Sequence, residues 1–247
     1  MVPENSVTLH SMNLLLLNPS DVIDNFTVVR GRQFEYLKTV HKAEVGDKIT
    51  LGIVNGGIGT GVIKSINNES ANIELTIESA APRSLPLTII LALPRPKMLR
   101  RVLQTMAAMG VKDIYLVNCS RVEKSYWQSP LLERGAIEEQ LLLGLEQAKD
   151  TVFPIVHLRK LFKPFVQDEL HSIAAGSLAI TAHPGTNNKC PINCSSPVTL
   201  AIGPEGGFIP YEIELLKEQG FDAVHLGPRI LRVENAVPAL VSRLFPA

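Results

Sequence analysis

Within the first eighty residues, apolar and polar positions alternate over short stretches, a pattern typical of β-strands with one buried face. The alternation is strict over 71–77. Two further strands are expected at 48–54 and 61–66, where a glycine-rich turn separates two apolar stretches. Small, polar and proline residues then fill 78–86, which is the composition of a linker. We therefore predict a β-rich first domain that ends near Pro82.

Beyond Pro82 the pattern changes to short, continuous apolar runs that alternate with helical periodicity. The strands are expected at 87–92, 114–117, 153–156, 177–181, 198–202 and 223–226. The helices are expected at 97–109, 129–147, 161–170, 210–219 and from 234 onward. Strands that alternate with helices predict an α/β domain over 83–247, with a mostly parallel sheet and helices on both faces.

The composition of the 247 residues restricts the class of protein. Hydrophobic residues are 45% and charged residues 19%, which excludes disorder, and the aromatic content of 5% favours an aliphatic core of buried parallel strands. No apolar run approaches the ~18–20 residues that span a membrane, and the opening segment lacks the cationic start of a secretory signal. The three cysteines, Cys119, Cys190 and Cys194, cannot all pair, which indicates a reducing compartment. A cytoplasmic globular protein without a membrane partner is expected.

Charge is balanced overall, with 24 basic and 24 acidic residues, but it is unevenly distributed. Eight basic residues against two acidic ones lie between Arg83 and Lys124, and four of them fall within seven positions. Charge alone favours a solvated helix face and leaves a phosphate-binding patch as the alternative.

Two segments, each after a predicted strand, carry the candidate chemistry. Gly203–Gly207 has three glycines and a proline, so its backbone can approach a ligand closely. The second segment, 226–236, contains a Gly-Pro turn, two arginines and a helix start. Open α/β sheets bind ligands at the carboxyl ends of their strands, where both segments are placed. Neither segment has the glycine spacing of a dinucleotide site or a phosphate loop.

These two segments resemble the signature of the RsmE family, ribosomal RNA uridine-N3 methyltransferases of the SPOUT superfamily. The resemblance is carried by Ala201–Phe208, Glu212 and Leu226–Ala236. It extends to Leu91–Pro94, Gln104, Met109–Val111, Leu37, Val40, Lys42 and Gly46–Asp47. It therefore covers nearly the whole chain.

The resemblance implies a trefoil-knotted SPOUT domain at 83–247, a PUA-like β-barrel at 1–82 that binds RNA, and a homodimer. The implied activity is methylation of uridine N3 in small-subunit (16S) ribosomal RNA with S-adenosylmethionine. The implied cofactor-binding residues are Gly203, Pro204, Glu205, Gly206, Gly207, Leu226, Gly227, Ile230, Leu231 and Ala236. The expected RNA-binding residues are Arg30, Arg32, Lys42, Arg95, Lys97, Arg100 and Arg101.

Methyl transfer to N3 requires alignment of the donor with the attacking nitrogen and removal of the N3 proton. We assign Arg232 to steadying the uracil or its neighbouring phosphate. Glu234 is expected to orient its loop or to take part in proton removal.

The chain departs from the family pattern at positions expected to touch RNA or support catalysis. These are Met12–Leu15, Thr105, Ala108, Ala148–Asp150 and Asn235. A non-catalytic or differently targeted RNA-binding SPOUT paralogue is therefore the alternative. An oxidoreductase is disfavoured because both phosphate motifs are absent. Cys190 and Cys194 with His183 lack an evident fourth ligand, so no metal is expected.

Overall fold

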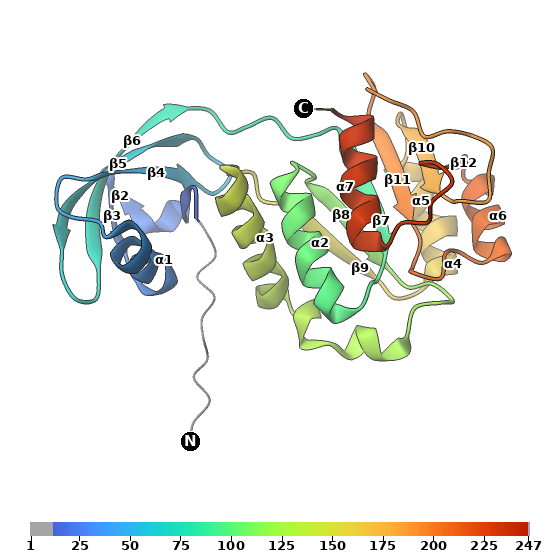
Figure 1. Ribbon diagram of the computed structural model, residues 1–247, viewed down its shortest axis with the longest axis horizontal. Coiled ribbons are helices and arrows are strands. Elements are labelled where there is room, and N and C mark those ends of the chain that lie inside the picture. The colour runs from blue at the N-terminus through green and yellow to red at the C-terminus, as the bar shows by residue number, and fades with distance from the viewer. Residues whose placement is uncertain (1–11, 247) are drawn as a thin grey trace. The chain divides into compact units, whose positions relative to one another are not determined.

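The computed structural model describes residues 12–246 (Figure 1). The expectation that the chain lacks a secretory signal concerns residues 1–11, which lie outside the described residues. The described chain forms two compact units, one of residues 12–82 with 145–153 and the other of 83–144 with 154–246. Each unit contains its own six-stranded sheet.

The sheet of the first unit is curled and has the strand order β1-β4-β5-β6-β3-β2 (Figure 1). Its strands are β1 Leu15–Leu17, β2 Val22–Ile23, β3 Phe26–Val29, β4 Lys48–Ile53, β5 Ile58–Ile66 and β6 Ala71–Ser79. Neighbouring strands are antiparallel except β1 and β4, which are parallel. The strands expected at 48–54, 61–66 and 71–77 are therefore present, with β5 and β6 longer than predicted.

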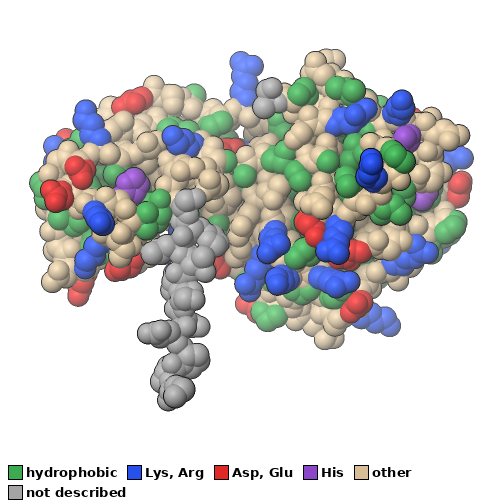
Figure 2. All heavy atoms as spheres, in the orientation of Figure 1, with side chains coloured by type: hydrophobic (Ala, Val, Ile, Leu, Met, Phe, Trp, Pro, Cys, Tyr) green, Lys and Arg blue, Asp and Glu red, His purple; other side chains and the backbone are tan. Residues whose placement is uncertain are grey.

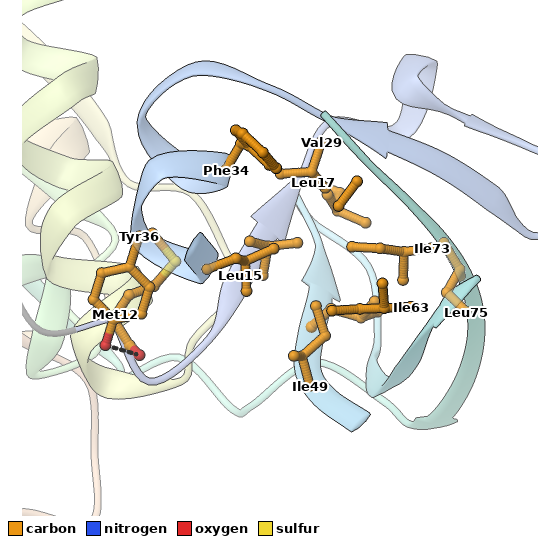
Figure 3. Close-up of a cluster of buried hydrophobic side chains, with 13 residues drawn as sticks. Met12, Leu15, Leu17, Val29, Phe34, Tyr36, Ile49, Ile63, Ile73 and Leu75 are labelled. Atoms are coloured by element: carbon orange, nitrogen blue, oxygen red, sulfur yellow. Dashed lines mark hydrogen bonds between the residues drawn. The ribbon is translucent and has the colours of Figure 1, made fainter. Parts of the chain in front are cut away.

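Aliphatic side chains from the concave face of this sheet form the core of the first unit (Figure 3). The alternation along β6 places Ile73 and Leu75 inward, where they meet Ile63 of β5. Phe34 covers the cluster and is 1% exposed. At one end, the Tyr36 hydroxyl donates a hydrogen bond of 3.0 Å to the Met12 carbonyl. The pattern that predicted the strands also builds this core.

The first unit contains a helix that the sequence pattern did not predict. Helix α1, Gly31–Tyr36, continues as a π-helical turn over Leu37–His41, and a 3-10 turn occupies Pro19–Asp21. Phe34 and Leu37 are both buried, and their spacing of three positions is that of one helix face. The prediction of a β-rich first domain did not include this helix, because two apolar positions at this spacing are too few to be distinguished from a strand.

The second unit is built on an all-parallel sheet with the order β12-β10-β11-β7-β8-β9. The strands are β7 Leu87–Ala92, β8 Asp113–Val117, β9 Ile155–Arg159, β10 Leu178–Ala182, β11 Val198–Ile202 and β12 Asp222–Val224. All five residues of β11 are buried. The predicted parallel α/β sheet is confirmed, and its continuous apolar runs reflect burial on both faces.

Helices lie on both faces of this sheet: α2 and α7 pass in front of it in Figure 1, and the fainter α4 and α5 lie behind it. The helices are α2 Pro96–Ala108, α3 Arg134–Ala148, α4 Phe162–Pro164, α5 Leu170–Ile173, α6 Pro210–Glu218 and α7 Val233–Leu244, with a π-helical turn at Phe165–Glu169. None of the helices between residues 12 and 246 is long and apolar enough to span a bilayer.

The single helix expected at 129–147 is in fact two elements. Ser129 caps a short 3-10 helix, Pro130–Leu132, by accepting a hydrogen bond of 3.3 Å from the Leu131 N–H. Helix α3 begins separately at Arg134. A Ser-Pro start is a local signal that fits both kinds of helix, so the sequence could not separate them.

Candidate ligand pocket at the carboxyl edge of the parallel sheet

A pocket of about 190 Å³ lies where β10, β11 and β12 end. These three strands are adjacent and parallel, so the segments that follow them emerge at one edge of the sheet. All ten residues expected to bind a cofactor line this pocket, namely Gly203, Pro204, Glu205, Gly206, Gly207, Leu226, Gly227, Ile230, Leu231 and Ala236. The fold therefore brings the two candidate segments together.

The first wall of the pocket is the glycine-rich loop that follows β11. Its turn is closed by the Gly207 N–H, which donates to the Pro204 carbonyl at 2.7 Å, and Gly207 has a left-handed φ of +73°. At Gly203 a Cβ atom would lie 3.0 Å from the Phe208 nitrogen and 3.1 Å from its ring. Because Phe208 is itself buried, glycine at 203 lets the loop fold back closely on its own anchor.

This loop is also contacted by two arginines that follow other strands. Arg121, beyond β8, donates from its guanidinium to the Gly206 carbonyl. Arg95, beyond β7, lies 3.6 Å from the Glu205 carboxylate. Residues 203–207 therefore line the pocket and are also contacted by two arginines that do not line it.

The base of the same loop is held by the buried carboxylate of Glu212, in the first turn of α6. Glu212 is 2% exposed and accepts hydrogen bonds from the N–H groups of Ile209, at 3.0 Å, and Ser120, at 2.7 Å. The neighbouring Cys119 thiol is buried, and this burial, with the nearby Glu212 carboxylate, raises the pKa of Cys119. The thiol therefore stays protonated and is no nucleophile at neutral pH.

The second wall is the segment between β12 and α7. Its first residue, His225, donates to the Asn188 carbonyl at 2.8 Å and accepts from the Cys190 N–H at 2.9 Å. Throughout the described chain, no backbone hydrogen bond involves residues 226–231. Ile230 is 82% exposed, and hydrophobic side chains gather over this region in Figure 2. The second wall is thus held by backbone hydrogen bonds at His225 and Arg232, and its tip around Ile230 is exposed.

The sequence analysis missed several lining residues. They are Ala182, His183, Pro184, Ile202, Val224, His225, Arg229, Val233 and Leu240. The end of β10 follows the same strand-end rule as β11, and this rule could have indicated His183. Val233, Ala236 and Leu240 lie on one face of α7, so helical spacing could have added two of them.

The two residues expected to be catalytic, Arg232 and Glu234, are not among the lining residues. Arg232 is the N-cap residue of α7, and its carbonyl accepts from the N–H groups of Asn235 and Ala236 at 2.9 and 2.7 Å. Glu234 lies in the first turn of the helix. Both are sequence neighbours of Val233, which does line the pocket.

The residues expected to bind RNA are divided between the two units. In the second unit Arg95, Lys97, Arg100 and Arg101 are exposed at the start of α2, where Figure 2 shows Lys and Arg side chains gathered. In the first unit Arg30 and Lys42 are exposed.

Arg32, also in the first unit, is engaged in an ion pair. Its guanidinium lies 2.7 Å from the buried Glu146 carboxylate, which also accepts from the Gln33 amide at 3.0 Å. Burial raises the pKa of Glu146, and these two partners oppose that shift. Arg32 therefore stabilises the first unit internally.

The chemistry of the pocket indicates its kind of ligand. Ile202, Val224 and Leu240 supply buried apolar surface, and the glycine loop supplies backbone groups. Glu205 and Arg229 supply charges of opposite sign. This set suits an apolar ring joined to a zwitterionic end. Among residues 12–246, no group of three potential metal ligands is found.

The fold and the pocket define an α/β ligand-binding domain with its pocket at the carboxyl edge of a parallel sheet. The family model described as RNA methyltransferase domain matches residues 81–245, so the chain belongs to that family. Within it the chain is a member of the RsmE family, as the two signature segments led us to expect.

One similar protein is the ribosomal RNA small subunit methyltransferase E of Treponema pallidum. It is 29% identical over 238 residues, which cover 92% of this chain and 88% of the relative. The Neisseria gonorrhoeae methyltransferase E, solved with S-adenosyl methionine bound, has a TM-score of 0.76 at 21% identity and covers 94% of this chain and 96% of that one. A Legionella pneumophila structure in complex with bound SAM has a TM-score of 0.73 at 22% identity, with 94% and 95% covered. At these identities the two structures show that the fold is shared.

Proposed function

We infer that this protein transfers a methyl group from S-adenosylmethionine to N3 of a uridine in 16S ribosomal RNA. The observation that carries this inference is the convergence of the two RsmE signature segments on one pocket. The names of the relatives and the cofactor in the neighbouring structures support the same activity.

The residues of the pocket fit S-adenosylmethionine. The apolar residues Ile202, Val224 and Leu240 suit the adenine ring, and backbone groups of the glycine loop suit its nitrogen atoms. Glu205 suits the positive charges of the amino and sulfonium groups, and Arg229 suits the carboxylate. When bound, the cofactor supplies a methyl group already activated on sulfur. The protein then has to hold this methyl in line with N3 and exclude water.

We propose that Arg232 and Glu234 act on the uridine at the margin of the pocket. The Arg232 guanidinium steadies the uracil or its neighbouring phosphate. The Glu234 carboxylate orients its own loop or accepts the N3 proton. Their support is their place on either side of Val233, which lines the pocket, with Arg232 exposed.

We propose that the exposed cations Arg30, Lys42, Arg95, Lys97, Arg100 and Arg101 bind the RNA backbone, as clustered cations do by releasing counterions. Arg32 was also expected to bind RNA. Because its guanidinium pairs with the Glu146 carboxylate, we propose that Arg32 stabilises the first unit and contributes to RNA binding only indirectly. The target uridine should lie in a non-helical or opened segment, because base pairing hides N3.

Four features of the family are further proposals for this chain. They are a PUA-like barrel at 1–82, a trefoil knot within a SPOUT domain at 83–247, a homodimer and a cytoplasmic location. The knot is supported by the strand order, in which β11 is inserted between β10 and β7. The homodimer is supported by the apolar side chains of Ile230 and Leu231, which line the pocket and stay exposed.

Two measurements test the function against the alternative of a non-catalytic RNA-binding paralogue. Calorimetry with S-adenosylmethionine should show binding, and deletion of the gene should remove a primer-extension stop at one N3-methyluridine in 16S RNA. A protein that binds RNA without binding the donor would be the paralogue. Methyl incorporation should fall in Arg232→Ala and Glu234→Gln, and near-normal turnover in both would remove these residues from the mechanism.

A further inference from the structure

Arg121 contacts the glycine loop at 203–207 but does not line the pocket. It is 85 residues from Gly206 in sequence, yet its guanidinium donates to the Gly206 carbonyl. The approach is close, since a Cβ atom at Gly206 would lie 3.0 Å from the Arg121 Cδ. Neither Arg121 nor its segment lines the pocket, so the contact acts on the loop and not directly on a ligand.

The backbone that carries Arg121 is itself fixed by Glu212. The buried Glu212 carboxylate accepts from the Ser120 N–H, one residue before Arg121, and also from the Ile209 N–H at the end of the loop. One carboxylate therefore ties the segment after β8 to the base of the loop, and Arg121 ties the same segment to the loop's apex. The two contacts form one linked brace.

A brace matters because the loop is rich in glycine. Gly206 and Gly207 have more accessible backbone conformations than other residues, and a ligand that orders them loses binding free energy to this ordering. A hydrogen bond from a charged donor that holds the Gly206 carbonyl beforehand reduces that loss.

We propose that Arg121 is a positioning residue for methyl transfer: it holds the 203–207 loop in its donor-binding shape, and Glu212 holds Arg121. The proposal rests on the proposed function and deepens it. It requires that loss of Arg121 weakens donor binding and leaves the affinity for RNA unchanged. A phosphate-binding arginine would give the opposite pattern.

The test compares Arg121→Met with Lys124→Met in the full-length protein. Lys124 is an exposed cation three residues further along the chain and has no assigned part in the pocket. Calorimetry with S-adenosylmethionine should show a dissociation constant about tenfold higher for Arg121→Met and unchanged for Lys124→Met. With saturating donor, kcat and the KM for RNA should stay near wild type in both variants.

Glu212→Gln and the double variant Arg121→Met/Glu212→Gln sharpen the test. The glutamine keeps one acceptor oxygen and loses the other, so donor binding should weaken as it does in Arg121→Met. Because both residues act through one brace, the affinity of the double variant for S-adenosylmethionine should be about the same as that of the single variant with the lower affinity. Urea unfolding of each variant verifies that the protein measured is folded, and Arg121→Lys, which keeps the charge, should recover part of the affinity.

Unchanged donor affinity in Arg121→Met, or a raised KM for RNA with unchanged donor affinity, would overturn the proposal. Strictly additive effects of the two substitutions would overturn the role of Glu212. Absence of donor binding by the wild-type protein would instead reject the proposed function itself, so the two failures are distinguishable.

Discussion

The two walls of the pocket carry equally clear sequence signatures but are held in different ways. The loop at 203–207 is closed by its own turn and contacted by Arg121 and Arg95, and its base is tied by Glu212. The segment 226–231 has no backbone hydrogen bond to the rest of the described chain, and its tip is exposed.

This difference indicates that the two walls have different roles in donor binding. A braced wall can provide a fixed shape for the donor before it binds, because the protein has already ordered its glycines. An open wall can close on the donor or meet another surface after binding. Substitutions in the first wall should therefore affect donor binding most, and those at the tip of the second wall should hardly affect folding.

The most severe test of the braced wall is Gly203→Ala. Its methyl would lie 3.0 Å from the Phe208 backbone nitrogen, so the loop or Phe208 must shift by a few tenths of an ångström. We expect the dissociation constant for S-adenosylmethionine to rise about a hundredfold, or ~2.7 kcal/mol. Calorimetry measures this directly. Gly135→Ala, where a Cβ meets nothing within 4 Å, is the control and should bind normally; equal affinities of the two variants would contradict the close packing.

The next effect concerns the stability of the brace. Glu212→Ala removes the acceptor of two N–H groups and should lower the free energy of unfolding by about 2 kcal/mol. Urea denaturation measures the loss. Glu214→Ala, on the same helix, removes an exposed carboxylate 3.9 Å from Lys217 and should change stability by less than ~0.5 kcal/mol. A similar loss in both variants would mean that helix α6, and not the brace, is affected.

A third substitution separates donor binding from RNA binding. Arg100 and Arg101 are exposed on α2, and neither lines the pocket. Replacing both with alanine should weaken binding of a 16S RNA fragment about fivefold. The slope of the logarithm of the binding constant against the logarithm of the salt concentration should become shallower by about one to two. Donor affinity should stay the same. Lys217→Ala, an exposed cation on α6, is the matched control, and an equal loss there would show a non-specific charge effect.

The smallest effect is expected at the tip of the open wall. Ile230→Ser changes a side chain that is 82% exposed, so the free energy of unfolding without ligand should change by less than ~0.5 kcal/mol. Thermal denaturation at low protein concentration provides this value. A larger loss would show that Ile230 is buried in solution, and the contrast between the walls would then fail.

The sequence predicted the parallel sheet and both walls because these depend on local patterns. Apolar runs indicated β7 and β11. The ten cofactor-binding residues that the resemblance implied all line one pocket. The brace could not be predicted, since Ser120 and Glu212 are 92 residues apart, and the resemblance that includes Glu212 does not indicate its hydrogen-bond partners. The sequence analysis did not predict that His183 lines the pocket, because its segment has no glycine-rich signature. Strands and short signature segments can therefore be predicted from the sequence, whereas hydrogen bonds between loops that are distant in sequence cannot.

The central claim is that both walls enclose one methyl donor. A crystal structure with bound S-adenosylhomocysteine, the demethylated product, tests it most directly. We predict ligand density that contacts Gly203–Gly207 on one side and Leu226–Leu231 on the other. Density at another site, or density that contacts one wall and leaves the other several ångströms away, would contradict the claim.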